Sequence, residues 1–106
     1  MMFNVLDAPT CRKYDESTVV VLSGDTVNIS CLVDANPSDI DFVWSSNQTS
    51  KVMPVSNKYY NSSGTSSILT YKIPKFFNNI MLLCWARNEI GVQEKPCVYY
   101  VKQASK

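Results

Sequence analysis

The chain has 106 residues, 45% of them hydrophobic and 18% charged, with a formal net charge of +1. This length and composition fit one folded domain and exclude a disordered tail or a strongly basic nucleic-acid surface. No apolar run approaches the roughly 20 residues of a membrane span, and no signal-peptide core follows Met1. We therefore expect a domain taken from a longer protein, with Met1 added for expression.

Short β runs separated by turn residues follow one another along the chain, without a helical period. Strands are predicted over 17–22, 26–33, 40–44, 52–55, 66–73, 80–87 and 94–101, with a loop at 34–39. The alternation directs one set of side chains inward, namely Val27, Ile29, Cys31, Val33, Ile40, Phe42, Trp44, Leu69, Tyr71 and Ile73. Strands spaced in this way predict a β-sandwich.

The most specific motif consists of Cys31, Trp44 and Cys84. The cysteines are 53 positions apart, and the tryptophan lies 13 positions after the first. In an immunoglobulin-like domain, a disulfide joins strands B and F and a tryptophan of strand C packs against it. The spacing predicts an all-β, immunoglobulin-like sandwich of I-set-like Greek-key topology with a Cys31–Cys84 bridge. Another β-sandwich with unrelated cysteines is the alternative.

Two further cysteines, Cys11 and Cys97, lie near the first strand and on the last. The second half of the first strand runs beside the last strand in this fold, so a second disulfide between them is expected. Four dispersed cysteines in a small β-rich chain are typical of disulfides in an oxidising compartment. Free thiols are the alternative.

The sequence offers no catalytic constellation. Histidine is absent, which excludes Ser-His and Cys-His pairs. No C-x-x-C pair is present either, so a zinc site would need all four cysteines brought together from distant positions. Asp39 and Asp41 could form an acid pair or bind calcium, but a solvated strand is the more typical setting. We predict neither enzyme activity nor a metal, a cofactor or a nucleic-acid partner.

The surroundings of Cys84 depart from the usual immunoglobulin pattern. Leu82 occupies the position where a tyrosine is common, and it is expected in the core. With Cys84 inward, the period of two turns an apolar set outward, namely Val43, Met81, Leu83, Trp85, Val98 and Tyr100, rimmed by Asp41, Arg87 and Lys102. Such a patch predicts a protein-binding face. Alternatively, Val52, Val55 or Tyr59 folds over Trp85, or a neighbouring domain covers it.

Three N-x-S/T sequons begin at Asn28, Asn47 and Asn61. Asn28 is predicted to point outward from its strand, whereas Asn47 and Asn61 are predicted in turns. A glycan on Asn28 would cover the sheet opposite Trp85 and leave the Trp85 side free.

The two ends of the chain resemble each other. The strings FNVLDA (3–8) and YYVKQA (99–104) share an aromatic-x-Val-x-x-Ala pattern at an offset of 96 residues, about one domain length. This predicts a tandem array. Residues 1–8 would hold the expression start and the end of a preceding repeat, 9–102 the domain, and 103–106 a linker.

Several strings together resemble one immunoglobulin repeat of the Sidestep family, which are arthropod neuronal cell-surface receptors. They are APTC (8–11), CLVDANPSDIDFVWSSN (31–47), GTSSILTY (64–71), LLCWARNEIG (82–91) and EKPCVYYV (94–101). The resemblance implies an extracellular module of a single-pass receptor in axon guidance and synaptic partner choice, without direct membrane contact. It also implies immunoglobulin ligands of the Beaten path family and makes Leu82 a family trait.

One departure from that family concerns the turn before residue 80. Asn78 and Ile80 stand where the family has an acidic residue and a glycine. We therefore expect an altered turn, with Phe76 and Phe77 refilling that end of the core.

Other classes remain open. A structural spacer within a multi-domain ectodomain would have an inert outer face. A homophilic adhesion module of a nephrin-like family would bind a second copy of itself. An intracellular muscle-type repeat would require four reduced cysteines and no glycans.

Overall fold

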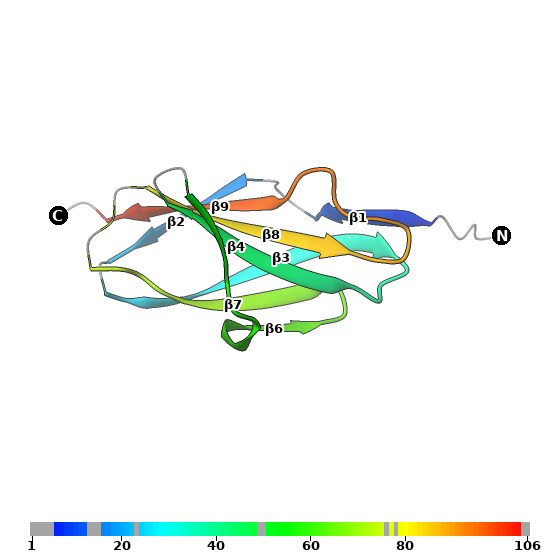
Figure 1. Ribbon diagram of the computed structural model, residues 1–106, viewed down its shortest axis with the longest axis horizontal. Coiled ribbons are helices and arrows are strands. Elements are labelled where there is room, and N and C mark those ends of the chain that lie inside the picture. The colour runs from blue at the N-terminus through cyan, green and yellow to red at the C-terminus, as the bar shows by residue number, and fades with distance from the viewer. Residues whose placement is uncertain are drawn as a thin grey trace.

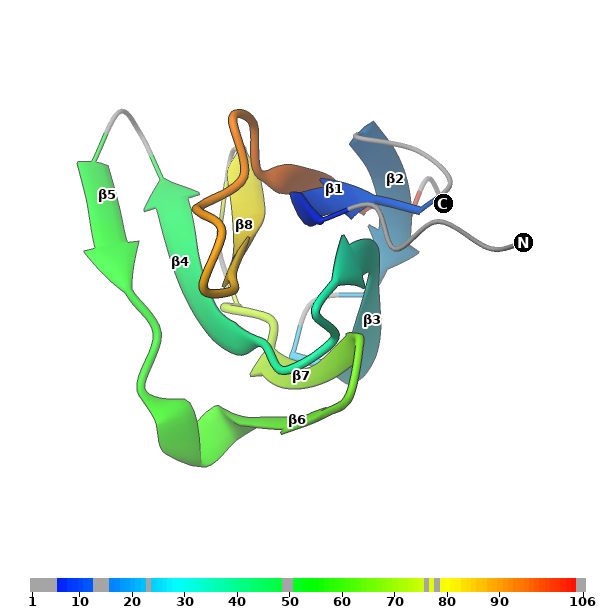
Figure 2. The ribbon, with the colours of Figure 1, turned by 90° about the vertical axis from the view of Figure 1, so that its right-hand side faces the viewer.

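Two β-sheets pack face to face in the computed structural model, which describes residues 6–12, 16–22, 24–48, 51–75, 77 and 79–104 (Figures 1 and 2). One sheet has the strand order β1-β3-β7-β6, comprising Asp7–Cys11, Thr26–Asn36, Ser66–Lys72 and Tyr60–Ser63. The other has the order β2-β9-β8-β4-β5, comprising Glu16–Val21, Cys97–Gln103, Ile80–Arg87, Asp41–Gln48 and Lys51–Pro54. A 3-10 turn, η1, spans Asn57–Tyr59. The predicted all-β immunoglobulin-like sandwich is confirmed.

The chain changes sheets between its first two strands. β1 pairs antiparallel with β3, whereas β2 pairs parallel with β9 in the opposite sheet. This is the arrangement from which the second disulfide was predicted. The domain is elongated, 55 × 24 × 23 Å. β1 begins at one end of the long axis and β9 finishes at the other (Figure 1).

Both predicted disulfides are present. Cys31–Cys84 joins β3 to β8 across the core, with a Cα–Cα distance of 6.5 Å. Cys11–Cys97 joins the last residue of β1 to the first residue of β9, with a Cα–Cα distance of 5.8 Å. No cysteine is free. Each bridge therefore ties one sheet to the other.

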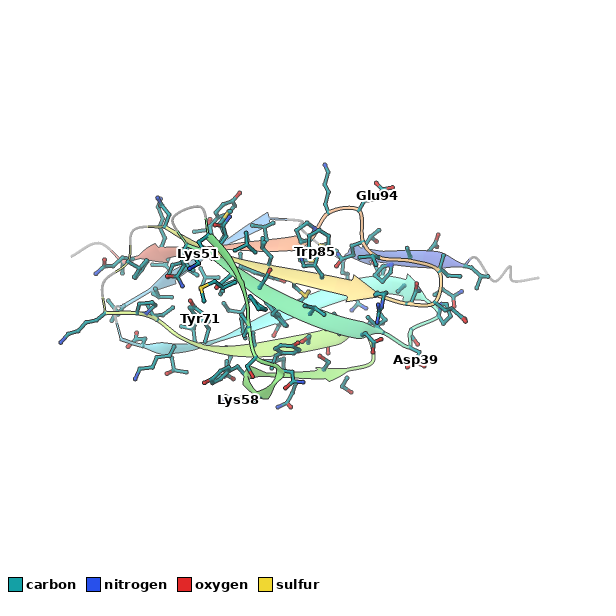
Figure 3. All side chains as sticks on the ribbon, in the orientation of Figure 1. Asp39, Lys51, Lys58, Tyr71, Trp85 and Glu94 are labelled. Atoms are coloured by element: carbon teal, nitrogen blue, oxygen red, sulfur yellow. A yellow bond between two sulfur atoms is a disulfide. The ribbon has the colours of Figure 1, made fainter. Side chains whose placement is uncertain are left out.

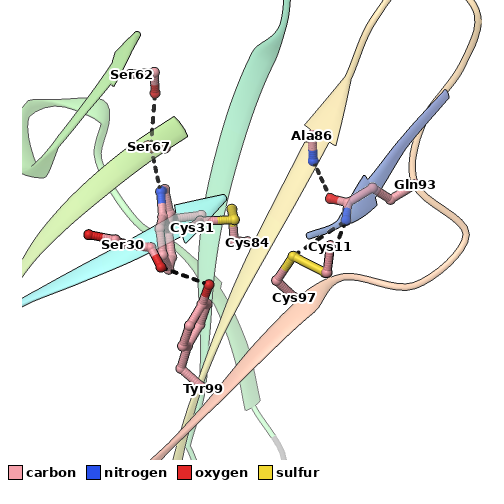
Figure 4. The surroundings of a disulfide bond; sticks show 11 residues. Cys11, Ser30, Cys31, Ser62, Ser67, Cys84, Ala86, Gln93, Cys97 and Tyr99 are labelled. Carbon is pink, nitrogen blue, oxygen red and sulfur yellow. Dashed lines mark hydrogen bonds between the residues drawn. A yellow bond between two sulfur atoms is a disulfide. The ribbon is translucent and has the colours of Figure 1, made fainter. Parts of the chain in front are cut away.

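Trp44 holds the centre of the core. Its side chain is completely buried, and its indole Nε1 donates a hydrogen bond to Ser67 Oγ at 2.9 Å. Ser67 is itself completely buried on β7 and accepts a second hydrogen bond, of 2.9 Å, from the Ser62 hydroxyl of β6 (Figure 4). A buried indole N–H needs such a partner. The contact links the two sheets.

Tyr99 of β9 crosses the same gap. Its ring centroid lies 5.7 Å from that of Trp44, and its hydroxyl donates to the Ser30 carbonyl at 3.0 Å (Figure 4). β1 pairs with β3 only as far as Val33, so the Ser30 carbonyl lies on the edge of β3 that β1 has left. Leu82, next to Tyr99 in the register, is fully buried. Tyr99 thus supplies an aromatic anchor in a domain that has Leu82 at the usual tyrosine position.

Several strands differ from their predicted extent. β8 has the predicted bounds, but β3 continues to Asn36, where a loop was predicted, because β1 pairs with this segment. β6 was not predicted. After Tyr60, which packs against the core, its residues are polar and exposed. They form a strand because they pair with β7 around a turn at Gly64, whose φ of 56° suits glycine.

The remaining core predictions divide into described and undescribed residues. Leu69 is fully buried and Tyr71 is half-buried, accepting a hydrogen bond from Gln48 Nε2 at 3.1 Å. Phe77 packs against the core and Ile80 lies within it. Phe76, Asn78 and residues 3–5 of the repeated string lie outside the described residues.

Replacing the Tyr99 hydroxyl should weaken the contact between the sheets. Tyr99→Phe keeps the ring against Trp44 but leaves the Ser30 carbonyl without its donor. We expect a loss of about 1 kcal/mol in the free energy of unfolding at pH 7, because a typical net hydrogen bond has this value. Urea unfolding of the two proteins measures it. An unchanged midpoint would show that water replaces the hydroxyl without cost.

The same residue predicts alkaline sensitivity. Burial raises the pKa of Tyr99 to about 12, above its ordinary value of 10.0. The unfolded chain therefore loses this proton first, so stability should fall as the pH rises from 10 towards 12. Tyr99→Phe should flatten this fall in thermal melts recorded across the range. A wild-type slope retained in the variant would assign the effect to other groups, such as Tyr71, whose pKa burial also raises.

Removing the Cys11–Cys97 bridge should lower the free energy of unfolding more than removing the Tyr99 hydroxyl does. The intact Cys31–Cys84 bridge shortens the loop that Cys11–Cys97 closes to a few tens of residues. The double variant Cys11→Ala with Cys97→Ala should therefore lower the free energy of unfolding by about 3–4 kcal/mol, the chain-entropy value for a loop of that length. Urea unfolding under non-reducing conditions tests this. A loss below about 1 kcal/mol would show that the bridge stabilises the domain far less than the chain-entropy model predicts.

Candidate functional site

The six predicted apolar residues lie together on the outer side of β4, β8 and β9. Val43 pairs with Trp85, Leu83 with Val98, and Met81 with Tyr100. These pairs occupy successive rows of one sheet, because alternate residues along each strand share a face. We call the surface formed by Val43, Met81, Leu83, Trp85, Val98 and Tyr100 the Trp85 face.

This face is partly open to solvent within the domain. Val43 is 52% exposed and Tyr100 38%, whereas the other four members are half-buried. Figure 3 shows Trp85 on the side of its sheet that faces away from Tyr71 and the core. Trp85 therefore retains accessible surface at the end of a continuous apolar patch.

The residues proposed to cover Trp85 do not bury themselves on it. Val52 is 60% exposed, Tyr59 is 50% exposed, and Val55 packs against the core instead. Val52 lies beside Asn47 in the register and so extends the Trp85 face onto β5. Val20 of β2, 65% exposed, extends it on the other side. These two residues were missed because the pairing partners of the edge strands cannot be read from the sequence.

The charged rim forms at one end of the face. Arg87 Nη2 lies 3.2 Å from Asp41 Oδ2, and both side chains are largely exposed. Such a surface ion pair contributes at most about 1 kcal/mol, so it orients Arg87 more than it stabilises the fold. Lys102 is exposed near the opposite end. Ser45, although in the register beside Leu83, is buried, so it adds little to the rim.

Asn88 fixes the hairpin between β8 and β9. Its Nδ2 donates to the carbonyls of Asp7 at 2.8 Å and Pro37 at 3.0 Å. Its Oδ1 accepts from the amides of Ile90 at 3.0 Å and Gly91 at 3.2 Å. One buried amide therefore holds three segments together at this end of the sandwich.

Gln93 completes the same hairpin. It is buried, and its Oε1 accepts a hydrogen bond of 2.6 Å from the Ala86 amide. Its Nε2 lies 3.4 Å from Cys11 Sγ and 3.5 Å from Cys97 Sγ (Figure 4). β9 pairs with β8 only up to Cys84, so the Gln93 side chain supplies the partner that strand pairing would otherwise give. A buried glutamine in a loop has no sequence signature that separates it from an exposed one.

Of the three sequons, Asn28 lies where it was predicted, pointing outward from a strand, whereas Asn47 and Asn61 do not. Asn28 is exposed on β3 and accepts a hydrogen bond of 2.9 Å from the Thr70 hydroxyl. Asn61 is exposed on β6, and Asn47 is half-buried on β4. Placing Asn47 and Asn61 in turns was wrong, because β4 continues to Gln48 and β6 forms.

Neither a metal-ligand cluster nor a membrane-spanning helix occurs among the described residues. Among the described residues, no group of three or more His, Cys, Asp or Glu lies close enough to hold a metal ion. Asp39 precedes β4 and Asp41 begins it. Within the same part of the chain, no helix is long and apolar enough to cross a bilayer.

The fold and motif place the chain in a known family. A model of the immunoglobulin domain matches residues 17–75, more than half of the chain, so this chain belongs to the immunoglobulin domain family. No curated protein sequence matches it.

Solved structures with the same fold include domains of titin and of a cell adhesion molecule. The titin tandem A164-A165 is 23% identical, with a TM-score of 0.66 over 92% of this chain and 48% of that chain. The titin Z1Z2 domains in complex with telethonin are 18% identical, with a TM-score of 0.69 over 96% and 50%. The N-terminal eight immunoglobulin domains of DSCAM are 14% identical, with a TM-score of 0.67 over 93% and 13%. The chain spans half or less of each of these structures, and the likeness establishes the fold alone.

The role of Gln93 can be tested directly. Gln93→Ala removes the acceptor of a buried amide, so we expect a loss of about 1–3 kcal/mol in the free energy of unfolding. Amide exchange at Ala86 should accelerate in the folded state. Glu94→Ala, at an exposed neighbour, serves as the control and should change neither quantity. Equal exchange rates of the Ala86 amide in the two variants would show that Gln93 does not protect this amide.

Proposed function

We propose that this chain is an extracellular immunoglobulin-like module of a cell-surface receptor, and that it recognises another protein through the Trp85 face. The observation that carries the proposal is the partly exposed apolar surface around Trp85, with Val43, Val20 and Val52 more than half exposed. Monomeric domains rarely leave a contiguous apolar patch open, and tryptophan, tyrosine and arginine are frequent at binding hot spots.

The bridges support an extracellular location. All four cysteines are paired, and disulfides persist in oxidising compartments. Three sequons add acceptor sites for a secreted protein. An intracellular muscle-type repeat is less compatible with two disulfides, although titin domains share the fold.

The partner class follows from the Sidestep resemblance. It points to an immunoglobulin protein of the Beaten path type, in axon guidance and synaptic partner recognition. Other immunoglobulin domains with this fold were solved with protein partners, including titin M10 with obscurin-like 1 and titin Z1Z2 with telethonin. The proposal for this chain is accordingly protein binding without catalysis.

A spacer role in a tandem array is the second candidate. It is favoured by the elongated shape and by strands that begin and finish at opposite ends of the long axis (Figure 1). Neighbouring domains on either side of residues 9–102 would then be the only partners. The two candidates differ in whether the Trp85 face binds a separate protein.

A binding screen distinguishes them. The domain, secreted and multimerised on a tag, is tested against a panel of neuronal ectodomains that includes the domain itself. Trp85→Ala should reduce binding at least tenfold, the effect of losing about 1.4 kcal/mol at a hot spot. Its melting temperature should change little, because Trp85 is only half-buried.

The matched control lies on the other sheet. Ile68→Ala removes an apolar side chain that is 45% exposed on β7, and it should leave binding unchanged. Equal losses in both variants would show that recognition does not depend on the Trp85 face. No binding by the folded wild type to any member of the panel would favour the spacer role.

A further inference from the structure

Asn47 lies on the same side of the sheet as Trp85, not in a turn beyond it. Trp44 and Gln48 both donate hydrogen bonds across the core, to Ser67 and Tyr71 of β7, so alternation turns Asn47 to the outer side of β4. Its register neighbours are Val52 on β5 and Met81 on β8, and Met81 pairs in turn with Tyr100 on β9. Asn47 therefore belongs to one row that crosses the Trp85 face.

The Asn47 side chain lines a shallow groove on the Trp85 face. The groove is lined by Thr18, Asn47, Asn79, Met81, Tyr100 and Lys102, together with parts of two core residues. Thr18 lies beside Tyr100 in the parallel pairing of β2 with β9. The floor is apolar and the edges are polar, which suits an amphipathic group that emerges from Asn47 and lies along the sheet.

The other two sequons do not lie on the Trp85 face. Asn28 lies on β3 and Asn61 on β6, both in the opposite sheet. A glycan on either would leave the Trp85 face open. Asn47 is the sequon that would place a bulky, solubilising group on the proposed binding surface.

We propose that an N-linked glycan on Asn47 covers the Met81–Tyr100 half of the Trp85 face and confines partner contact to the Val43–Trp85 half. The proposal rests on the extracellular location given under the proposed function. Val43 lies four residues from Asn47 along β4, about 13 Å at the rise of a strand. The row of Trp85 is the row of the face farthest from the attachment point, so it is the part that the proposal leaves accessible.

Glycosylation of Asn47 would also regulate partner binding at the Trp85 face. A copy without the glycan would expose both halves and bind more surface, whereas a glycosylated copy would offer only the Trp85 end. Occupancy of a single sequon would then set both the strength and the selectivity of recognition. It would equally reduce non-specific association through the apolar patch.

The test compares two sequon variants secreted from the same cells. Thr49→Ala abolishes the Asn47 sequon while keeping Asn47 itself, and Ser63→Ala abolishes the Asn61 sequon as a matched control. Intact mass and peptide mapping report occupancy. The rate at which dilute hydrogen peroxide oxidises Met81 then shows whether the glycan covers the groove, because Met81 lines it. Met53 on β5 is exposed and serves as the internal reference.

We expect wild type to carry a glycan at Asn47 and Met81 to oxidise several-fold faster in Thr49→Ala than in wild type or Ser63→Ala. Wild type deglycosylated after folding should behave like Thr49→Ala, which guards against a folding defect in the variant. Binding to the ectodomain panel should rise several-fold in Thr49→Ala and stay unchanged in Ser63→Ala.

An unoccupied Asn47, or equal Met81 oxidation in all three proteins, would overturn the inference and leave the proposed function intact. Slower oxidation in wild type with equal binding by all variants would overturn the confinement of the partner. If no variant binds the panel, the proposed function fails, and the oxidation rates still decide whether the glycan covers the face.

Discussion

The hydrogen bond from the Trp44 indole to Ser67 is the contact on which the rest of this domain depends. Both residues are completely buried, and they belong to opposite sheets. An unpaired indole N–H here would cost about 1–3 kcal/mol, so the sheets must meet at this distance and in this register. Ser62 orients the Ser67 hydroxyl from β6, and Tyr99 packs on the indole from β9. The position of Trp44 thereby sets which residues of each strand face inward.

Once the inward residues are assigned, the outward ones follow without further choice. Cys84 faces the core because it bridges to Cys31, so Trp85 must face away from it. Tyr99 faces inward to Trp44, so Tyr100 is directed outward beside Met81. The apolar outer surface is therefore not a packing defect, because moving any of these residues inward would displace a residue that anchors the core.

Much of this could be predicted from the sequence, and what could not shares one physical cause. Cys31, Trp44 and Cys84 predict the sandwich because their spacing is the one at which a bridge and a tryptophan share one core, and here Trp44 lies beside Cys84 in the register. β6, the end of β3 and the positions of Asn47 and Asn61 were mistaken because pairing with another strand decides them, whether that strand is near in the sequence or far. Gln93 was missed for the same reason, since its partner Ala86 and the Cys11–Cys97 bridge converge only in the fold. Local pattern predicts which face a residue takes, but it does not predict where a strand finds its neighbour.

That distinction decides how the outer surface should be interpreted. With Asn47 in a turn, the three sequons would leave the sheet of Trp85 uncovered. With β4 extended to Gln48, Asn47 shares a row with Met81 and Tyr100, and the same surface holds both an apolar patch and an N-x-T sequon. An apolar patch attracts many partners, whereas a fixed polar group beside it excludes those that need the whole area. Selectivity on this sheet would then arise from the register of β4 as much as from the exposed tryptophan.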